Sequence, residues 1–386
     1  MQLEDYGMSA SRGFLSSFEL PDVTLPAMFA PMLAVADNLS ALMTSGRVQH
    51  WLRAMPALDL ADFAATAPEE QVRAAMVRYS FLVQAYVWGE AETPHVLPAN
   101  LAVPMVALAD RLGQAPLLPY SAYVLDNWAR IDRTTPITLD NIQICQHFIG
   151  GDDENWFVLI HVGIEAAAGE ALALACELVD CANANDVAGA TQRLAAMAGV
   201  WARINAIFDR MPERCDPYIY YQRVRPFIHG WANNPALPDG LVYEGVARFG
   251  GAGQAYRGQT GSQSSIVPAM DALFGVDHSN DPLRAFLDEL HAYRPVPHRA
   301  FIDDLRVAST LRAFAVAADD QPLKDAFNAI VLAVSAFRTR HLEYAASYIN
   351  RQASSGAGND TEVGTGGTPF MKYLKKHRDE NRAQVI

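Results

Sequence analysis

The sequence predicts an all-α protein made of a small N-terminal helical domain and a large C-terminal helical bundle domain. Apolar residues recur at steps of three and four over several long segments, and strand-like alternation is nearly absent. The 386 residues, of which 51% are hydrophobic and 19% charged, are enough to form two hydrophobic cores. Prolines gather between Pro94 and Pro119, so we expect a connector near residues 95–120. We place the domain boundary between residues 1–112 and 113–386.

Seven segments carry the helical spacing. Pro68 opens the first and Pro322 the last, since proline is favoured in the first turn of a helix. Pro226 should kink the fifth just after Arg225, because proline lacks the N–H that a helix interior requires. The predicted helices are Glu69–Trp88, Leu101–Leu112, Asn155–Cys181, Val187–Arg210, Pro217–Trp231, Asp281–Tyr293 and Leu323–Ile349.

The net charge and the apolar segments bear on localisation and partners. A formal charge of -13, with no basic run longer than Lys372–Arg378, argues against a nucleic-acid or anionic-membrane partner. The first residues are acidic where an export signal is basic, and the most apolar stretch, Ala326–Phe337, is shorter than the roughly 20 residues that span a bilayer. We expect a cytoplasmic monomer or weak homo-oligomer without a membrane segment. The cysteines, which we expect to be reduced thiols without a role, are Cys145, Cys176, Cys181 and Cys215.

The best-marked catalytic motifs are absent. There is no HExxH, no GxSxG and no GxGxxG after a strand, which removes the zinc hydrolase, α/β-hydrolase and Rossmann interpretations. Two glycine-rich segments, Gly250–Ser265 and Ser354–Thr368, also lack the GK[ST] of a phosphate-binding loop. Their composition is typical of flexible surface loops, and the functional alternative is a mobile lid over a pocket.

The last predicted helix carries a histidine on its apolar face. The residues of this face are Leu323, Phe327, Ile330, Val334, Phe337, His341, Tyr344 and Tyr348. A desolvated imidazole must find partners for its nitrogens or lose about 1–3 kcal/mol, and a nearby carbonyl or carboxylate is the commoner partner. Arg338 lies one turn earlier and Arg340 is adjacent. Two such cations suit an anionic cofactor whose carboxylates need bidentate donors, as haem propionates do.

A second histidine repeats this pattern on the helix predicted from Asn155. The apolar face there consists of Phe157, Ile160, His161, Ile164, Ala168 and Leu172. Taken alone, His161 is expected to be a core histidine bonded to Glu165 one turn later. Alternatively, His161 and His341 could face opposite sides of one flat cofactor, or His161 and Glu165 could contribute to a non-haem iron site.

An arginine in aromatic company marks the helix predicted from Pro217. Tyr220 and Tyr221 precede Arg225 by one turn, and Tyr221 shares its helix face at i,i+4 spacing. A cation-π stack at the surface is the commoner arrangement. The functional alternative is a clamp for a substrate carboxylate beside an aromatic wall, which suits an aromatic amino acid.

Several motifs resemble one known family, the haem-containing indoleamine 2,3-dioxygenases. They follow the family's order and cover most of the chain beyond about residue 80. They are YVWGE at Tyr86–Glu90, LPANLAVP at Leu97–Pro104, PYSAYVLDNW at Pro119–Trp128, GLVYEG at Gly240–Gly245, GSQSS at Gly261–Ser265, FRTRHLEYAASYI at Phe337–Ile349 and GTGGT at Gly364–Thr368.

This resemblance implies that the large domain holds haem b, with His341 as the proximal iron ligand. It assigns haem contacts to Arg338, near a propionate, and to Asp271, Ser262 and Val267. It implies that Arg225 binds the carboxylate of an indole substrate and that Thr365 contacts the substrate from the closing loop. The expected catalytic residues are His161, Arg225 and Thr365. The expected substrate contacts are Tyr120, Tyr123, Phe157, Tyr220, Tyr221, Arg225, Gly261 and Thr365.

The implied reaction inserts dioxygen across the indole C2–C3 bond of L-tryptophan or a related indoleamine and gives an N-formylkynurenine-type product. His161 departs from the vertebrate enzymes, which have serine there, and is similar to the distal histidine of the tryptophan 2,3-dioxygenases. Tyr220 and Tyr221 replace phenylalanines of the vertebrate enzymes, and Tyr123 stands where those enzymes have a smaller residue. We therefore expect a tighter, more polar pocket. The alternatives are a haem monooxygenase of a substituted indole, a haem-based sensor, and a helical protein without cofactor.

Overall fold

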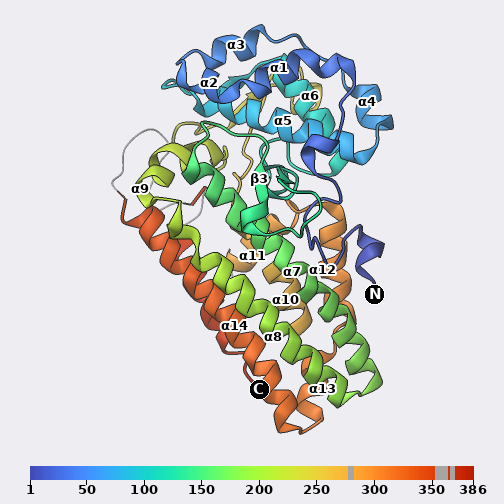
Figure 1. Ribbon diagram of the computed structural model, residues 1–386. Coiled ribbons are helices and arrows are strands. Elements are labelled where there is room, and N and C mark those ends of the chain that lie inside the picture. The colour runs from blue at the N-terminus through green and yellow to red at the C-terminus, as the bar shows by residue number, and fades with distance from the viewer. Residues whose placement is uncertain (277–281, 353–363, 366–369) are drawn as a thin grey trace.

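Helices make up nearly all of the regular structure, which confirms the predicted all-α class with two helical domains (Figure 1). This computed structural model describes residues 1–276, 282–352, 364–365 and 370–386. The helices of the small domain lie together at one end of the molecule. They are α1 (Ala30–Asp37), α2 (Leu39–Thr44), α3 (Val48–Ala54), α4 (Ala61–Thr66), α5 (Glu69–Trp88) and α6 (Ala99–Leu112).

The centre of the small domain is α5, and its bounds are those predicted. Glu69 and Glu70 lie in the first turn, where negative charge is favoured by the helix dipole, and nearly every residue from there to Val87 is buried. Helix α6 packs against α5 and contains the buried Pro104. The expectation of a connector is therefore wrong for residues 99–112, while the domain boundary after residue 112 stays a prediction.

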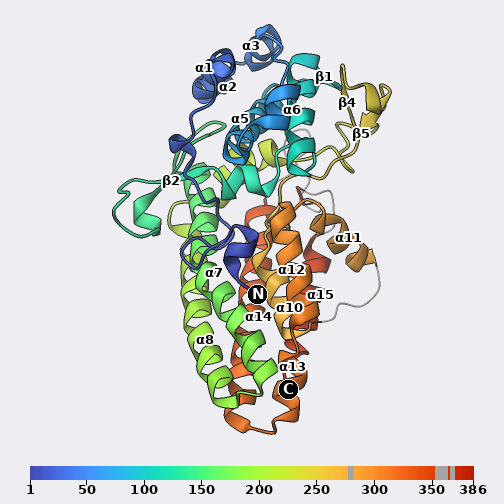
Figure 2. The same ribbon diagram turned by 90° about the vertical axis from the view of Figure 1, so that its right-hand side faces the viewer.

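The strands of the described residues are few and short. In one sheet, β1 (Val96–Leu97) pairs in parallel with β4 (Leu241–Tyr243), which pairs antiparallel with β5 (Gly253–Gln254). Figure 2 shows this sheet beside α6, at the end of the molecule that the small domain occupies. A segment from the second half of the chain thus returns to the small domain. The other sheet is a hairpin of β2 (Trp128–Arg130) and β3 (Ile142–Ile144).

Three long helices form the large domain's bundle. Helix α8 (Val187–Asp209) packs against both α7 (Asp152–Ala184) and α14 (Gln321–Ala345) (Figure 1). By length and composition α7 could span a membrane, but 67% of its most apolar window is buried, which is typical of a core helix. The expectation that Ala326–Phe337 is the most apolar stretch therefore missed this longer apolar window in α7. The remaining α-helices of this domain are α9 (Pro217–Ile219), α10 (Ile266–Phe274), α11 (Pro282–His291), α12 (Val296–Ala308), α13 (Leu311–Ala317) and α15 (Phe370–Arg382).

The start of α7 is fixed by Glu154 in its first turn. The carboxylate of Glu154 accepts hydrogen bonds from three successive backbone N–H groups, those of Phe148, Ile149 and Gly150, at 2.6, 3.0 and 2.7 Å. Gly151 precedes the helix at φ 100°, a conformation that favours glycine. Because the helix start is held in this way, the side chains two turns later have a defined direction into the domain.

The described part of the large domain contains three π-helical turns. They are η4 (Ser121–Leu125), η7 (Tyr220–Val224) and η11 (Ala346–Asn350). The predicted helix Pro217–Trp231 is therefore wrong in its later part, since α9 passes into η7 and then into the 3₁₀ turn η8 (Arg225–Ile228). Pro226 lacks the N–H that would continue α-helical bonding. Likewise, α14 ends at Ala345 and η11 follows it, so the helix predicted to Ile349 changes its winding in the last turn.

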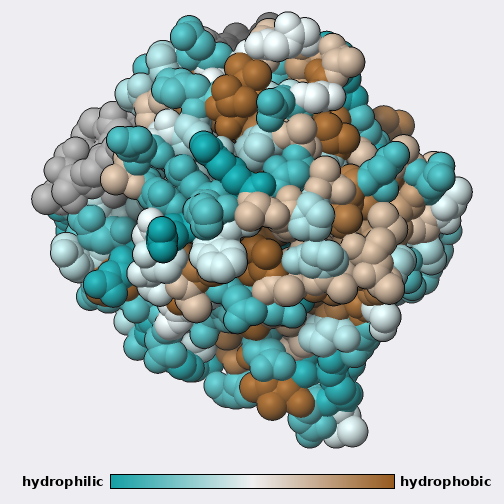
Figure 3. Space-filling view, turned by 90° about the horizontal axis from the view of Figure 1, so that it is seen from above, coloured by the Kyte–Doolittle hydropathy of each residue, from teal (hydrophilic) through white to brown (hydrophobic). Residues whose placement is uncertain are grey.

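The surface of the small-domain end is mixed in character. In Figure 3, which looks onto this end, brown hydrophobic side chains are interspersed among teal hydrophilic ones. The exposed large apolar residues of the small domain include Met28, Trp51, Val96 and Val103, with Trp51 at 50% the most exposed. Scattered apolar residues of this kind are ordinary on soluble proteins.

Candidate active site

Two cavities in the large domain share part of their lining. The larger has a volume of about 300 Å³ and the smaller about 130 Å³. Both imidazoles singled out in the sequence, His161 on α7 and His341 on α14, line both cavities. The other residues common to the two linings are Phe208, Gly261, Ser262 and Leu374. The structure therefore brings the two predicted histidines together at one site.

His341 continues the predicted apolar face of α14. Leu323, Phe327 and Ile330 on that face are fully buried, whereas His341 is half-buried because its ring borders the cavities. The imidazole makes no hydrogen bond to any residue that the structure describes, so the commoner expectation of a carbonyl or carboxylate partner does not hold for this part of the chain. Burial, with smaller effects from the nearby His161 and Arg338, lowers the pKa of His341 to about 4. The ring is therefore neutral and offers a nitrogen lone pair to the cavity, as a metal ligand must.

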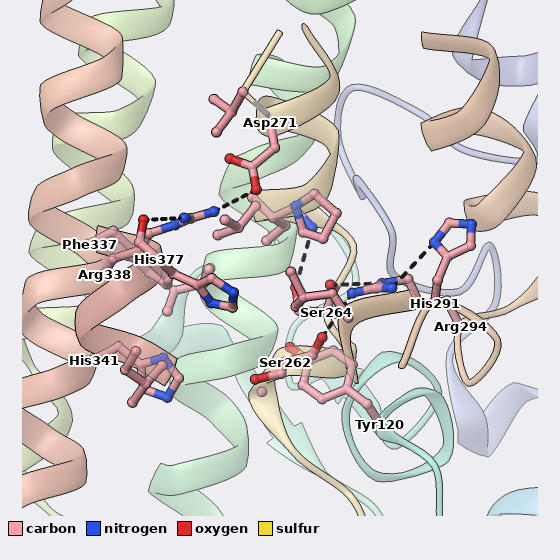
Figure 4. A pocket seen from close by; sticks show the side chains of 18 of the residues that line it. Tyr120, Ser262, Ser264, Asp271, His291, Arg294, Phe337, Arg338, His341 and His377 are labelled. Carbon is pink, nitrogen blue, oxygen red and sulfur yellow. Dashed lines mark hydrogen bonds and ion pairs between the residues drawn. The ribbon is translucent and has the colours of Figure 1, made fainter. Parts of the chain in front are cut away.

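Arg338 lies one turn before His341 and forms a buried ion pair. Its Nη2 donates to Oδ2 of Asp271 on α10 at 2.6 Å, and its Nη1 donates to the backbone carbonyl of His377 on α15 at 2.8 Å (Figure 4). All three residues line the larger cavity. Arg340 does not join them, because its side chain is 41% exposed and pairs with Asp209 at 2.7 Å. Of the two cations expected beside His341, only Arg338 faces the cavity.

The hydrogen bond of His161 defines which nitrogen can accept a proton. Nδ1 lies 2.7 Å from the backbone carbonyl of Phe157, and because a carbonyl only accepts, Nδ1 must carry the hydrogen. Burial lowers the pKa of His161, so the ring is neutral and Nε2 retains its lone pair. Nε2 lies close to Gly261, in the wall of both cavities. The expectation that Glu165 is the partner of His161 is wrong.

Glu165 instead binds two hydroxyl groups from other segments. Its Oε1 accepts hydrogen bonds from the phenol of Tyr120 and from Oγ of Ser264, each at 2.8 Å. Oε2 has no partner among the described residues, and the side chain is fully buried. Burial raises the pKa of Glu165 to about 7, although the two hydroxyl groups act in the opposite direction. The carboxyl group is thus close to half-protonated at neutral pH.

Because Gln mimics the neutral acid, Glu165→Gln is expected to remove one source of pH dependence from stability. The pKa of Glu165 is higher in the folded protein than in the unfolded chain, so the folded state binds the proton more tightly. This contribution is full below about pH 4.5 and is lost as the pH rises to about 7, by about 2–3 kcal/mol. Urea unfolding of both proteins in the same haem state at pH 5 and pH 8 measures it. An equal change of unfolding free energy in the two proteins would contradict the raised pKa.

The segment Gly261–Ser265 is a fixed turn rather than the flexible surface loop expected for the first glycine-rich segment. It begins with the 3₁₀ turn η10 (Gly261–Gln263), and Gln263 is only 2% exposed. The amide of Gln263 accepts from the backbone N–H of Tyr120 at 3.0 Å and donates to the carbonyl of Gly258 at 3.1 Å. These bonds fix the Gly261 and Ser262 wall against the segment that carries Tyr120.

The other predicted site residues fall into three groups. Those lining the smaller cavity are Phe157, Tyr220, Gly261, Ser262 and Thr365. Those lining the larger cavity are Tyr120, Gly261, Ser262, Val267, Asp271 and Arg338. Those lining neither cavity are Tyr123, Tyr221 and Arg225, all fully buried. The first two groups meet at His161 and His341. Of the third group, Tyr123 lies behind the wall of the smaller cavity, with its ring centroid 6.4 Å from that of Phe157.

Arg225 has the aromatic neighbour that its spacing predicted. Its guanidinium carbon lies 5.4 Å from the centroid of the Tyr221 ring. The expectation of a surface stack is wrong, because Arg225 has no exposed area. Tyr220, on the same turn, packs its ring against that of Phe157 with centroids 4.7 Å apart, and both line the smaller cavity.

Thr365 joins the far end of the chain to this site. Its Oγ1 donates to the carbonyl of Gln259 at 2.6 Å, and its own carbonyl accepts from the backbone N–H of Gly230 at 3.3 Å. The remaining residues of the GTGGT motif, 366–368, and most of the second glycine-rich segment lie outside the described residues.

The residues of the larger cavity fit a haem. A neutral imidazole without a hydrogen-bond partner among the described residues stands in the same lining as a buried arginine, and this lining also includes Ile164, Val267 and Phe337. Such a set suits a flat apolar ring with an anionic edge, held at the metal by one histidine. No group of three or more His, Cys, Asp or Glu side chains in the described part of the chain could hold a metal ion, so the non-haem iron alternative lacks its ligand set there.

Some residues of the site were missed in the sequence. Phe208, His377 and Leu374 line the larger cavity, and Arg294 reaches it from the end of α11. Phe208 lies within the predicted helix Val187–Arg210, but only contact with α14 distinguishes it from other core residues. Ser264 lies within the quoted GSQSS motif, which could have identified it.

The comparisons with known proteins agree with this site. The sequence model of the family described as Indoleamine 2,3-dioxygenase matches residues 2–384. The chain is 32% identical to Indoleamine 2,3-dioxygenase 2 of Homo sapiens over 402 residues, which covers 100% of this chain and 96% of that protein. It is 30% identical to Indoleamine 2,3-dioxygenase 1 of Rattus norvegicus, with the same coverage, and 28% identical to Indoleamine 2,3-dioxygenase of Saccharomyces cerevisiae over 99% of this chain and 93% of that protein. The chain therefore belongs to the indoleamine 2,3-dioxygenase family of haem-dependent oxidoreductases.

Proposed function

We propose that this protein inserts both atoms of dioxygen across the indole C2–C3 bond of L-tryptophan, or of a closely related indoleamine, and releases an N-formylkynurenine-type product. The observation that carries the proposal is the pair of neutral imidazoles in one lining. His341 has no hydrogen-bond partner among the described residues, and His161 presents a lone pair at Nε2. One ring is suited to an iron ligand and the other to an indole N–H.

The cofactor of this proposal is haem b in the larger cavity. His341 would ligate the iron, and Arg338, oriented by Asp271, would hold a propionate. Ser262 and Val267 would form the wall against the ring. When bound, haem would supply the binding and activation of dioxygen, chemistry that protein side chains do not provide. The residues themselves bind, orient and exclude water.

The smaller cavity is the proposed site of the indole ring. Phe157 and Tyr220 offer an aromatic wall, and Gly261 leaves room for a ligand near Nε2 of His161. His161 would accept a hydrogen bond from the indole N–H and so orient the C2–C3 bond. It would not remove this proton, because an indole N–H is far too weak an acid for a neutral imidazole. Thr365 would close the cavity, and Arg225 would bind the substrate carboxylate, with Tyr120, Tyr123 and Tyr221 supporting these walls.

His161→Ala is expected to lower kcat/KM for L-tryptophan, and 1-methyltryptophan, which lacks the N–H donor, is expected to be a poor substrate of the wild type. The mutation should affect the methylated substrate much less, because the bond is already absent and the added space relieves a clash. The coupling between the two changes should be about 1–3 kcal/mol, the contribution of one buried hydrogen bond. Steady-state kinetics of both enzymes on both substrates measure it. Equal losses would exclude a hydrogen bond to the indole.

Turnover of L-tryptophan under ¹⁸O-labelled dioxygen, followed by mass spectrometry, tests the proposed function directly. Two labelled atoms in a ring-opened product are the expected result. One labelled atom in a hydroxylated product would establish the monooxygenase alternative instead. An absence of any product, from protein that carries haem and is kept reduced, would contradict tryptophan as the substrate and leave the sensor alternative.

We also propose that the protein is a cytoplasmic monomer or weak homo-oligomer with domains 1–112 and 113–386. The small-molecule indole and dioxygen are its proposed partners, without nucleic acid or membrane. The net charge of -13 supports the absence of an anionic polymer partner. Sedimentation of the purified protein over a range of concentrations measures the oligomeric state.

A further inference from the structure

Arg294 is a buried cation whose partners among the described residues are all neutral. It follows α11, is 2% exposed and lines the larger cavity. Its Nε donates to the carbonyl of Ser264 at 3.2 Å and its Nη2 to the carbonyl of Ser262 at 2.8 Å, while Nη1 lies 3.4 Å from Nδ1 of His291 (Figure 4). A guanidinium has five N–H groups, so these three contacts leave two that no described residue accepts.

Each carboxylate that the described residues contribute to the lining of the larger cavity already pairs with another arginine. Asp271 pairs with Arg338 at 2.6 Å, Asp288 with Arg284 at 2.9 Å, and Asp303 with Arg306 at 3.0 Å. Arg294 forms no ion pair with any described residue. Burial, together with the charge of Arg306, lowers the pKa of Arg294 to about 10, and the opposing charges of Asp271 and Asp303 offset only part of this effect.

A buried guanidinium without a counter-ion is unfavourable, because the lost hydration of the charge is not replaced. Arg73, another arginine with little exposure, forms an ion pair with the carboxylate of Asp126. Arg294 retains its charge on a cavity wall, so the missing negative charge is expected from whatever occupies the cavity.

We propose that Arg294 binds a carboxylate of the bound haem and is a second propionate clamp, on a different wall of the larger cavity from Arg338. This inference rests on the proposed function, in which haem occupies this cavity and Arg338 holds one propionate. Haem carries two propionates on one edge, and Arg294 supplies the cation that the second requires. Through its bonds to the carbonyls of Ser262 and Ser264, the same guanidinium ties that propionate to the turn whose Ser264 hydroxyl binds Glu165.

The test compares loss of haem with loss of haem dimethyl ester, in which both carboxylates are masked. Each reconstituted protein is mixed with excess apomyoglobin, and the transfer rate is followed in the Soret band. Arg294→Met should accelerate the transfer of haem by about 10- to 100-fold, as expected for a lost charge-assisted hydrogen bond, and leave that of the ester unchanged. The matched control is Arg306→Gln, which removes a cavity cation that Asp303 already neutralises. It should change neither rate.

Two results would overturn the assignment. Equal acceleration for haem and its ester would mean that Arg294 acts only by holding the Ser262–Ser264 turn. Unchanged rates for both would mean that no propionate reaches it. Wild-type protein that binds no haem at all would instead contradict the proposed function.

A second measurement uses wild-type protein alone and so does not depend on the folding of a variant. A synthetic haem with a single propionate should transfer about 10-fold faster than haem from the wild type, because only one of the two arginines then has a partner. Equal rates would show that the second propionate contributes nothing to haem retention, and the proposal that Arg294 binds it would be wrong.

Discussion

Alanine in place of His341 is expected to abolish stable haem binding by the purified protein. His341 is the neutral imidazole in the cavity lining that lacks a hydrogen-bond partner among the described residues, so it alone in the proposed site is assigned a bond to iron. Loss of an outer-shell partner typically lowers metal affinity by about 10- to 100-fold, and loss of the ligand itself should exceed this. Absorption spectra of the ferric and ferrous carbon monoxide forms, at a measured haem-to-protein ratio, report the change.

Two controls separate ligation from packing. His291→Ala removes another imidazole from the same lining, but Nε2 of His291 binds Asp303 at 3.2 Å, so this variant should keep its axial ligand. Added imidazole should restore the haem spectrum in His341→Gly, because the free ring can occupy the vacated space. A His341→Ala protein with an unchanged spectrum and full carbon monoxide binding would show that the proximal ligand is a different residue.

The helices that periodicity predicted best are those whose apolar faces are long. The apolar faces of α5, α7, α8 and α14 extend over several turns and pack against one another or against α6. Their apolar residues therefore recur at steps of three and four over a long stretch of sequence. By contrast, α10 and α13 are only 9 and 7 residues long, which is too short for a periodic signal. The π-helical turns could not be predicted, because the choice between i+4 and i+5 bonding depends on packing by distant segments.

The candidate site shows the same limit at the level of single side chains. Helical spacing placed His161 and Glu165 on one side of α7, but it could not show that the partners of Glu165 are Tyr120 and Ser264, which lie 45 and 99 residues away in sequence. The same holds for Arg225. Its neighbour Tyr221 follows from i,i+4 spacing, whereas its complete burial depends on the fold around the turn η7. Local pairs are readable from sequence, and long-range partners and burial are not.

Arg225→Ala is expected to weaken the use of L-tryptophan by about 2–5 kcal/mol, or roughly 30- to 5,000-fold in kcat/KM, if the substrate carboxylate loses a buried charged partner. Arg225 is fully buried, and it is near enough to Tyr220 to oppose the effect of burial, which raises the pKa of that phenol. Tyr220 lines the smaller cavity, whereas Arg225 does not, so the guanidinium must turn away from the Tyr221 ring to meet a carboxylate placed there. Haem content should not change.

Tryptamine separates this role from packing, because it has the indole and the amine but no carboxylate. The wild type should use tryptamine far less well than L-tryptophan, and Arg225→Ala should impose little further loss on it. The matched control is Arg223→Ala, an exposed arginine on the same turn, which should leave both substrates unaffected. Equal losses on the two substrates, with a lowered unfolding temperature, would mean that Arg225 supports the cavity wall through its cation-π contact with Tyr221. Unchanged kinetics for L-tryptophan would remove Arg225 from substrate binding altogether, and the carboxylate would have to be held by another group, for which Thr365 at the rim of the smaller cavity is the first residue to test.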